Sequence, residues 1–364
     1  MNVVVKIGTS SITDEHGEIA QRAIEKLAAE VAVLRSQGHR VVVVTSGAIS
    51  AGLPALGLSG ARPADVATLQ AVSAVGQSRL MAAYDNAMAA HGLVTGQVLL
   101  APLDFMYRSQ YLHARGTFTR LLDLGVVPVV NENDAVADDE IRYGDNDHLA
   151  ALVAHLIVAD LLVLLTDTTG LHSADPRLNA DASLIEEVVE FDHELEQMAG
   201  GRGTLRGSGG MASKLQAAKM AAWSGIRTVI AAADRPAVLP AAVAGEPGVG
   251  TVVRPKDRRL PARKLWIAFA KPYEGVLEVD EGARRALTER GTSLLPVGVV
   301  GVTGDFGAGD AVEIADRAGT VFAKGLVRVD AGALRASAGR RTADLPEGAA
   351  QEVVHRDDLV LTVT

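Results

Sequence analysis

A glycine-rich segment ends in a lysine where a helix is expected to begin. Residues 207–214 read G-S-G-G-M-A-S-K, and helical spacing of apolar residues follows from Met211. Glycine lets backbone N–H groups approach an anion closely, and the N–H groups at a helix start favour phosphate. Lys214 adds a positive charge there. The order Ser-Lys excludes a Walker A loop. Because Gly/Ser-rich segments are also common linkers, the segment alone favours phosphate binding and a linker equally.

Polar residues also follow four segments that have the composition of buried strands. Ligands of open α/β sheets bind beyond the carboxyl ends of the strands, so we expect these four clusters to surround one site. A flexible cation beside a glycine suits phosphate, and a small turn suits contact of its backbone amides with an anion, although it is equally typical of an ordinary strand-to-helix turn. The clusters are Lys6-Ile7-Gly8, Ser46-Gly47-Ala48, Asn131-Glu132-Asn133-Asp134 and Thr166-Asp167.

A second polar group, Gly144-Asp145-Asn146-Asp147, precedes an expected helix. Together with the cluster that starts at Asn131, it favours a binding site for one polar substrate. Aspartate and asparagine are also common helix caps, and paired acidic residues suit Mg²⁺, so both alternatives stay open. The histidines show no spacing typical of a zinc site or a catalytic triad.

The first 250 or so residues alternate between strand and helix patterns. Continuous apolar strands separated by amphipathic helices predict a three-layer α/β/α fold with a mostly parallel sheet. The expected strands cover residues 3–7, 41–45, 93–100, 126–130, 161–166 and 227–232, and the expected helices cover 20–37, 65–90 (with a potential break at Gly76) and 147–159.

The pattern changes after residue 253. Residues 254–271 contain seven Lys/Arg, one acidic residue and two prolines, which is typical of a junction between domains. Short strands and glycine turns follow, with one helix over 281–290, and predict a small β-rich domain. We therefore divide the chain into an α/β domain (1–253), a basic linker (254–272), a β-rich domain (273–352) and a C-terminal tail (353–364).

Composition narrows the class of protein. The 364 residues suffice for two domains, and 48% hydrophobic with 22% charged residues is a globular composition. A net charge of −9 argues against broad nucleic-acid binding. The absence of cysteine excludes disulfides and cysteine-ligated zinc and fits a cytoplasmic protein. We find no signal peptide and no apolar run long enough to span a membrane.

Taken in order, the motifs resemble those of the bacterial glutamate 5-kinase family, within the amino acid kinase superfamily. The second domain resembles the PUA domain that usually completes that enzyme. Ser208, where threonine is common, and Leu205-Arg206 depart from the family pattern, but serine keeps the hydroxyl. The matching motifs are Lys6-Ile-Gly-Thr-Ser, Thr45-Ser-Gly-Ala-Ile, Ala74-Val-Gly-Gln-Ser-Arg-Leu, Asn131-Glu-Asn-Asp-Ala-Val, Gly144-Asp-Asn-Asp, Thr166-Asp, Ala174-Asp-Pro-Arg, Gly209-Gly-Met-Ala-Ser-Lys, Val279-Asp-Glu-Gly-Ala, Ser293-Leu-Leu-Pro-Val-Gly and Gly304-Asp-Phe.

The resemblance implies transfer of the γ-phosphoryl group of ATP to the side-chain carboxylate of L-glutamate, which is the first step of proline biosynthesis. It implies that Lys6 and Lys214 are catalytic and that Asp147 holds them in place. It also implies Mg²⁺ bridging the phosphates, for which we assign no side-chain ligand. The implied substrate-binding residues are Ser46, Gly47, Ala48, Asn131, Asp134 and Asn146, and the implied nucleotide-binding residues are Lys6, Gly8, Thr166, Asp167, Ser208, Gly209, Gly210, Met211, Ala212, Ser213 and Lys214.

The chemistry of the implied reaction explains why no general base stands out in the sequence. A glutamate carboxylate has a reference pKa of about 4.3, so it is already ionised at neutral pH, and catalysis depends on alignment and positive charge. Asp134 suits the α-ammonium of glutamate. N-acetylglutamate lacks that ammonium, so Asp134 disfavours an acetylglutamate kinase, and the cluster at Asn131 fits aspartokinase or uridylate kinase less well.

The family also suggests partners. These are proline as a feedback inhibitor, further copies of the chain in a dimer or tetramer, and a glutamate-5-semialdehyde dehydrogenase that consumes the labile product. The main alternative is an RNA-binding or RNA-modifying protein, because PUA domains commonly bind RNA. The basic junction favours that alternative, whereas nine basic against 13 acidic residues in 274–352 disfavour it.

Overall fold

The computed structural model describes residues 1–14, 18–58, 63–101, 103–136, 146–174, 179, 181–191, 195, 210–257, 259–270, 273–341, 344 and 351–362. Ser208 and Gly209, together with the glycine-rich segment before Gly210, lie outside the described residues. The chain forms two compact units, Met1–Arg259 and Leu260–Thr364.

The first unit is built on an eight-stranded sheet in the order β3-β4-β2-β1-β5-β7-β8-β6. All strand pairs are parallel except β7 with β8. The strands are β1 (Asn2–Ile7), β2 (Arg40–Thr45), β3 (Thr95–Leu100), β4 (Val127–Glu132), β5 (Leu161–Thr166), β6 (Glu187–Val188), β7 (Arg227–Ala232) and β8 (Thr251–Val253). The expected mostly parallel sheet is confirmed.

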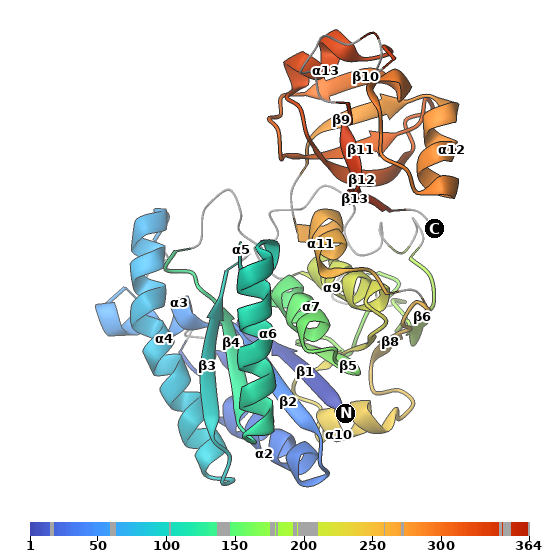
Figure 1. Cartoon of the computed structure of the whole chain (residues 1–364). Coiled ribbons are helices and arrows are strands. Elements are labelled where there is room, and N and C mark those ends of the chain that lie inside the picture. Colours follow the sequence, from blue (N-terminus) through green and yellow to red (C-terminus); the bar gives the residue numbers. More distant parts are fainter. Residues whose placement is uncertain are drawn as a thin grey trace. The chain divides into compact units, whose positions relative to one another are not determined.

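Helices cover both faces of this sheet (Figure 1). α2, α4 and α10 pack on one face, in a core with alternate residues of β1, β2 and β5, and α6, α7 and α9 lie over the other face. The helices are α1 (Thr9–Ile12), α2 (Gln21–Ser36), α3 (Ala48–Gly52), α4 (Val66–Ala89), α5 (Leu103–Met106), α6 (Arg108–Asp123), α7 (Asn146–Leu156), α9 (Met211–Trp223) and α10 (Val238–Ala244), with a 3₁₀ turn at Pro54–Leu56. The three-layer α/β/α architecture is thus confirmed.

The strand register brings the expected clusters to the same level. Ile7 at the end of β1 pairs with Thr45 of β2 and with Leu165 of β5. Val44 of β2 pairs with Val130 of β4. The residues that follow these positions therefore lie on one edge of four neighbouring strands. Asn131 and Glu132 belong to the end of β4 itself, because their backbone groups still pair with β3.

Helix α4 runs without interruption through Gly76, where the sequence allowed a break. A Cβ atom on Gly76 would lie 1.8 Å from the carbonyl oxygen of Ala48, and one on Gly52 would lie 2.1 Å from that of Val72. The two glycines thus let α3 and α4 approach each other to backbone distance. Close packing, rather than a helix break, accounts for glycine at this position.

The second unit contains a five-stranded sheet in the order β10-β9-β11-β12-β13 around its own apolar core. The expected β-rich domain is confirmed, and α12 has the expected bounds, whereas α13 was not expected. Its elements are α11 (Ala262–Leu265), a π-helix (Trp266–Ala270), β9 (Tyr273–Val279), α12 (Glu281–Arg290), a 3₁₀ turn (Pro296–Gly298), β10 (Val299–Gly304), β11 (Ala311–Ala315), β12 (Val321–Val327), α13 (Ala331–Ser337) and β13 (Val354–Leu361).

Strand β13 lies in residues 353–364, which the sequence analysis sets apart as a tail. It pairs with β12 and thereby belongs to the sheet. Arg356, Asp357 and Asp358 interrupt the apolar alternation of this segment, so its pattern does not indicate a strand. The segment is extended because it pairs with β12, and its own sequence pattern does not predict this.

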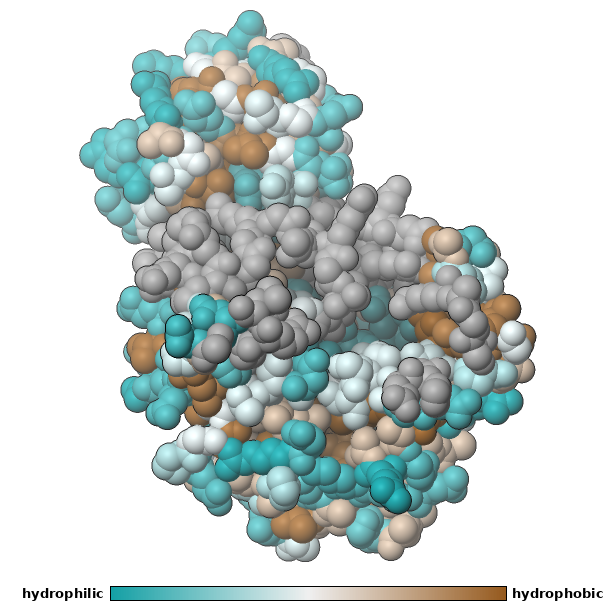
Figure 2. Space-filling view, turned by 180° about the vertical axis from the view of Figure 1, so that it is seen from behind, coloured by the Kyte–Doolittle hydropathy of each residue, from teal (hydrophilic) through white to brown (hydrophobic). Residues whose placement is uncertain are grey.

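Polar and apolar residues are interspersed over the coloured part of the surface in Figure 2. Among the residues described above, no helix combines the length and the apolar character needed to cross a lipid bilayer.

Candidate active site

Two buried lysines share one buried aspartate at the carboxyl edge of the sheet. Lys6 Nζ, from β1, lies 2.5 Å from Asp147 Oδ1, and Lys214 Nζ, from α9, lies 3.0 Å from Asp147 Oδ2. The side chains are 2%, 5% and 0% exposed for Lys6, Lys214 and Asp147. Ser213 donates a hydrogen bond to the same Asp147 oxygen as Lys214, at 2.9 Å. The structure thus brings together the three residues that the sequence analysis expects to be catalytic.

In the lysine–aspartate cluster, two ammonium groups face one carboxylate. Asp147 lies in the first turn of α7, where the helix dipole favours an anion. Lys214 lies in the first turn of α9, where the dipole disfavours a cation. Ammonium groups attract anions, and burial strengthens this attraction. The cluster is therefore suited to an anionic ligand.

Two glycines flank the lysine–aspartate cluster. A Cβ atom on Gly8 would lie 3.5 Å from Lys6 Nζ, so the backbone after β1 passes close to the ammonium group. Gly210 is the N-cap of α9, is exposed, and would contact nothing within 4 Å if it carried a Cβ. Met211, Ala212 and Ser213 follow it in the first turn of the helix. Helix N–H groups and ammonium groups thus lie side by side.

A group of hydrogen-bonded amides and hydroxyls lies next to the lysine–aspartate cluster. The two are linked through Asn146 and Asp147, which are neighbours in the sequence. Asn146 Nδ2 donates to the Thr45 carbonyl at 2.9 Å, to Ser46 Oγ at 2.8 Å and to Asn131 Oδ1 at 2.9 Å. Asn146 Oδ1 is buried and has no hydrogen-bond partner among the described residues. This amide network therefore presents a buried acceptor beside the lysine–aspartate cluster.

The turn after β2 needs a glycine. Gly47 has φ +100°, a left-handed conformation that favours glycine, and Ala48 then begins α3. Ser46 and Gly47 are half-buried and Ala48 is buried. Asp134, in a turn beyond β4, is also half-buried and accepts a hydrogen bond from Ser73 at 2.9 Å. All six expected substrate-binding residues thus lie at the ends of β2 and β4 or at the start of α7.

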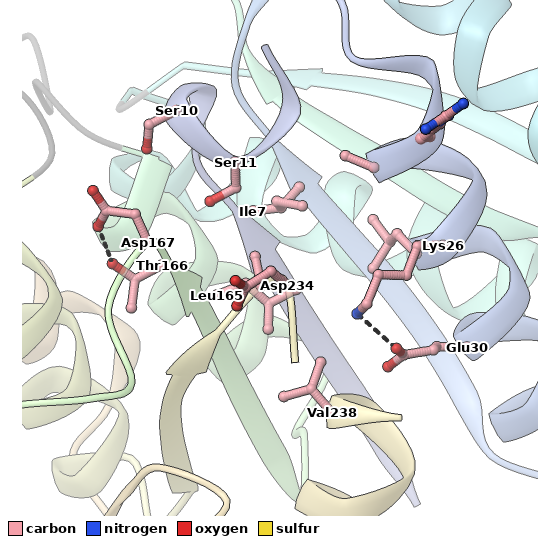
Figure 3. A pocket seen from close by; sticks show the side chains of 14 residues that line it. Ile7, Ser10, Ser11, Lys26, Glu30, Leu165, Thr166, Asp167, Asp234 and Val238 are labelled. Atoms are coloured by element: carbon pink, nitrogen blue, oxygen red, sulfur yellow. Dashed lines mark hydrogen bonds and ion pairs between the residues drawn. The ribbon is translucent and has the colours of Figure 1, made fainter. Parts of the chain in front are cut away.

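Thr166 and Asp167 line a cavity of about 420 Å³ at the ends of β1, β5 and β7. Figure 3 shows Ile7, Leu165 and Val238 between the Thr166–Asp167 pair and the Lys26–Glu30 pair. Side chains alternate along β1, so Ile7 faces this cavity whereas Lys6 faces α7 on the other side of the sheet. The expected nucleotide residues of β5 therefore border this cavity, and the side chains of the lysine–aspartate cluster do not line it.

The cavity is lined by both basic and acidic residues, so its charges favour neither an anionic nor a cationic ligand. Its lining includes two basic and three acidic side chains. The Glu30 carboxylate accepts hydrogen bonds from Lys26 Nζ at 2.7 Å and from the backbone N–H of Leu239 at 2.8 Å. The Lys26–Glu30 pair of α2 is thus connected with α10. We interpret the pair as structural.

Two polar residues of α4 join the site although the sequence analysis gives them no role: Gln77 lies within the quoted motif of residues 74–80, and Ser73 directly precedes it. Gln77 contacts Asn131, and Ser73 contacts Asp134. The signal was present as two polar residues four positions apart on a face that is otherwise apolar, with Leu69, Val72 and Leu80 buried beside them. Spacing alone does not distinguish such residues from a polar interruption of a helix face.

Comparison with known proteins identifies the family. Residues 1–232 match the model of the amino acid kinase family, and residues 275–349 match that of the PUA domain. The chain is 48% identical over 365 residues to a protein of Frankia casuarinae named glutamate 5-kinase, covering 99% of this chain and 96% of that protein. It is 44% identical over 365 residues to one of Caldanaerobacter subterraneus subsp. tengcongensis with the same name, covering 99% and 98%. The chain belongs to the glutamate 5-kinase family.

The kinase fold extends to more distant structures. Carbamate kinase from Giardia lamblia bound to AMP-PNP aligns with a TM-score of 0.51 and 17% identity, over 70% of this chain and 98% of that one. This likeness concerns the fold alone. Membership of the glutamate 5-kinase family therefore rests on the full-length relatives.

The glutamate 5-kinase family implies Mg²⁺ with ATP, so we tested whether the site fits the ion. Within the described ranges, no group of three or more His, Asp or Glu side chains is placed to hold a metal. Asp147 is already engaged by two lysines. Mg²⁺ commonly keeps several waters and binds through substrate phosphates with few protein ligands. The described residues thus offer no protein cage, and we derive no step through the metal.

Proposed function

We propose that the chain transfers the γ-phosphoryl group of ATP to the side-chain carboxylate of L-glutamate. A carboxylate oxygen forms a bond to the γ-phosphorus while the bond to the β,γ-bridging oxygen breaks, which yields L-glutamyl 5-phosphate and ADP. The observation that carries this proposal is the pair of buried ammonium groups of Lys6 and Lys214, held by Asp147 directly beside a polar amide network. We further propose that this is the first step of proline biosynthesis.

The lysines address the main obstacle to this reaction. The attacking carboxylate is already ionised at neutral pH, so no base has to remove a proton. The difficulty is to bring one anion against another. Lys6 and Lys214, held by the two oxygens of Asp147, are positioned to offset charge on the transferring phosphoryl group. Mg²⁺ carried by the ATP phosphates would supply further positive charge.

The amide network and Asp134 form the proposed site for glutamate. The buried acceptor of Asn146 and the carboxylate of Asp134 suit an ammonium group, which donates hydrogen bonds. Ser46, Gly47 and Ala48 supply a hydroxyl and backbone groups, and Asn131 orients Asn146. An N-acetylated substrate lacks the ammonium, so this arrangement favours the unmodified amino acid.

The proposed nucleotide site extends from the glycines to β5. Gly8 and residues 208–214 provide backbone N–H groups and Lys214 for the phosphates. Thr166 and Asp167 follow β5, the strand next to β1, and Asp167 is exposed and hydrogen-bonded by Thr166 at 3.1 Å. They suit the ribose or base of ATP.

We also propose regulation and partners on the basis of the family. Proline inhibits by competing at or beside the glutamate site, the chain assembles into a dimer or tetramer, and a glutamate-5-semialdehyde dehydrogenase consumes the labile acyl phosphate. The protein acts in the cytoplasm.

Substrate choice tests the proposed function. ADP release should be measured by a coupled assay with glutamate, aspartate, N-acetylglutamate and UMP as acceptors, each with MgATP. We expect release to depend on glutamate and to exceed that with the other three at equal concentration. Faster release with N-acetylglutamate or UMP would assign the site to another branch of the kinase fold.

A further inference from the structure

Helix α4 directs a row of buried polar side chains at the proposed amino-acid site. Ser73 and Gln77 are one helical turn apart and are 3% and 8% exposed. Tyr84, two turns further on the same face, is fully buried and its hydroxyl lies 2.8 Å from Thr45 Oγ1. Burial raises the pKa of Tyr84, so this hydroxyl stays protonated. Tyr84 thus reaches the end of β2, Gln77 the end of β4, and Ser73 the turn beyond β4.

Gln77 supports Asn131, whose orientation is fixed by the backbone. The N–H of Glu132 can only donate, and it lies 2.9 Å from the Asn131 atom that must therefore be the oxygen, Oδ1. Asn131 Nδ2 consequently points the other way, and it donates to Gln77 Oε1 at 2.8 Å. Gln77 is the acceptor for this buried amide among the described residues.

Asn131 in turn supports Asn146. The Asn146 amide nitrogen faces three acceptors, one of which is Asn131 Oδ1 at 2.9 Å. With the nitrogen held in this way, Asn146 Oδ1 is the buried atom that remains for a ligand. A chain of hydrogen bonds therefore runs from α4 through β4 to the start of α7.

The close contact of α4 with α3 makes this chain possible. Gly76 lies between the two polar residues of α4, and a side chain there would collide with the Ala48 carbonyl at 1.8 Å. Ala48 directly follows Ser46 and Gly47, which belong to the proposed amino-acid site. Packing at Gly76 thus fixes the distance from α4 to that site.

We propose that Gln77 is a positioning residue for the amino-acid substrate, acting through Asn131 on the acceptor of Asn146. Ser73 likewise positions Asp134, to which it donates a hydrogen bond at 2.9 Å. The inference rests on the proposed function in one respect, because it takes the substrate to be an amino acid with an ammonium group. Neither residue contacts the lysine–aspartate cluster in the described structure, so their effect concerns substrate binding rather than phosphoryl transfer.

Gln77→Met and Ser73→Ala test the inference in the full chain. Methionine keeps the shape of glutamine but offers no amide oxygen, and alanine removes only the hydroxyl. One lost hydrogen bond in each predicts a glutamate KM raised by about two- to tenfold, with kcat and the ATP KM nearly unchanged. Leu80→Val is the matched control, since Leu80 is a buried α4 residue of the apolar core. It should lower the Tm without a selective change in glutamate KM.

A double-mutant cycle separates positioning from a general effect on the fold. If Gln77 acts through Asn131, Gln77→Met should raise the glutamate KM much less in an Asn131→Ala background than in the unaltered chain. Equal effects in both backgrounds, or an unchanged glutamate KM in Gln77→Met, would overturn the inference. The unaltered chain is assayed first, because failure to use glutamate there overturns the proposed function itself.

Discussion

At the scale of single residues, the Lys6–Asp147–Lys214 cluster is difficult to explain by stability alone. Burying three charges costs desolvation energy that ion pairing does not reliably recover, and well-packed apolar residues often serve stability equally well. A fold that maintains such a cluster at a sheet edge is arranged for an anion.

Replacing Lys214 by alanine tests that reading. We expect Lys214→Ala to lower kcat by at least about a hundredfold, the scale of one lost electrostatic contact in the transition state. Lys219→Ala is the control, because Lys219 lies on the same helix but faces the ring of Phe191 at 5.8 Å. Steady-state kinetics of both variants are compared, and near-normal turnover of Lys214→Ala would refute its proposed role.

Asp134 should act on glutamate rather than on ATP. Asp134→Ala removes a charged partner of the α-ammonium, so we expect the glutamate KM to rise by about ten- to a hundredfold. Glutarate, which lacks the ammonium, is the control substrate. It should bind more weakly than glutamate to the unaltered chain, and its KM should hardly change in Asp134→Ala. A variant in which only the ATP KM moved would contradict our division of the site.

At the scale of elements, α7 connects the chemistry with the core. It carries Asn146 and Asp147 at its start and His155 in its last turn. Burial, followed by the positive charges of Arg259 and Arg115, lowers the pKa of His155 from 6.5 to about 4. His155 is therefore neutral in the folded protein, although a cation there would be favoured by the helix dipole.

The pKa of His155 predicts a loss of stability in acid. The unfolded chain binds a proton below pH 6.5 while the folded chain does not, so the free energy of unfolding falls as the pH drops from 6.5 towards 4. Between pH 7.5 and pH 5 we expect this group to contribute a loss of about 2 kcal/mol. Urea unfolding of the unaltered chain and of His155→Gln at both pH values measures it. An identical pH dependence in the two proteins would contradict this account.

The close contact of α4 with α3 leads to a prediction about the effect of Gly76→Ala on stability. Gly76→Ala would place a methyl group 1.8 Å from the Ala48 carbonyl, so α4 has to move. We expect a loss of about 1–3 kcal/mol in unfolding free energy, as for other overpacked sites. Gly116→Ala, at an exposed position of α6 where a Cβ atom would meet nothing within 4 Å, is the control and should stabilise by about 0.5–1 kcal/mol. Equal effects at the two glycines in urea unfolding would exclude a special role for Gly76.

Periodicity was sufficient to predict the elements but not all of their contacts. The strands at 161–166 and 227–232 were predicted with the bounds that the structure shows, because each is a continuous apolar run between clear breaks. The convergence of Lys6, Ser46 and Asn131 followed from the general position of ligands at strand ends. The contacts of Gln77 and Ser73 could not be predicted, because they depend on how closely α4 packs. β13 was missed because its charged residues interrupt the pattern.

At the scale of the whole molecule, each compact unit has its own apolar core. All described residues of the proposed active site lie in the first unit, 1–259. The role of the PUA unit is therefore separable in principle from phosphoryl transfer.

Deletion of residues 260–364 tests this separation. We expect glutamate-dependent turnover to remain largely intact, because no proposed catalytic or binding residue is removed, while inhibition by proline or the assembly state changes. Turnover assays with and without proline, together with light scattering for mass, measure the three properties. Loss of turnover in a truncated chain that remains folded by circular dichroism would place part of the catalytic function in the second unit.

Chemical identification of the product tests the central claim most directly. The unaltered protein is incubated with MgATP, glutamate and hydroxylamine, which converts an acyl phosphate into a stable hydroxamate. We predict γ-glutamyl hydroxamate, identified by mass spectrometry, in step with ADP release and strongly reduced in Lys214→Ala. Glutamate-dependent ADP release without any hydroxamate would contradict the account. Equal hydroxamate formation by the unaltered protein and by Lys214→Ala would also contradict it.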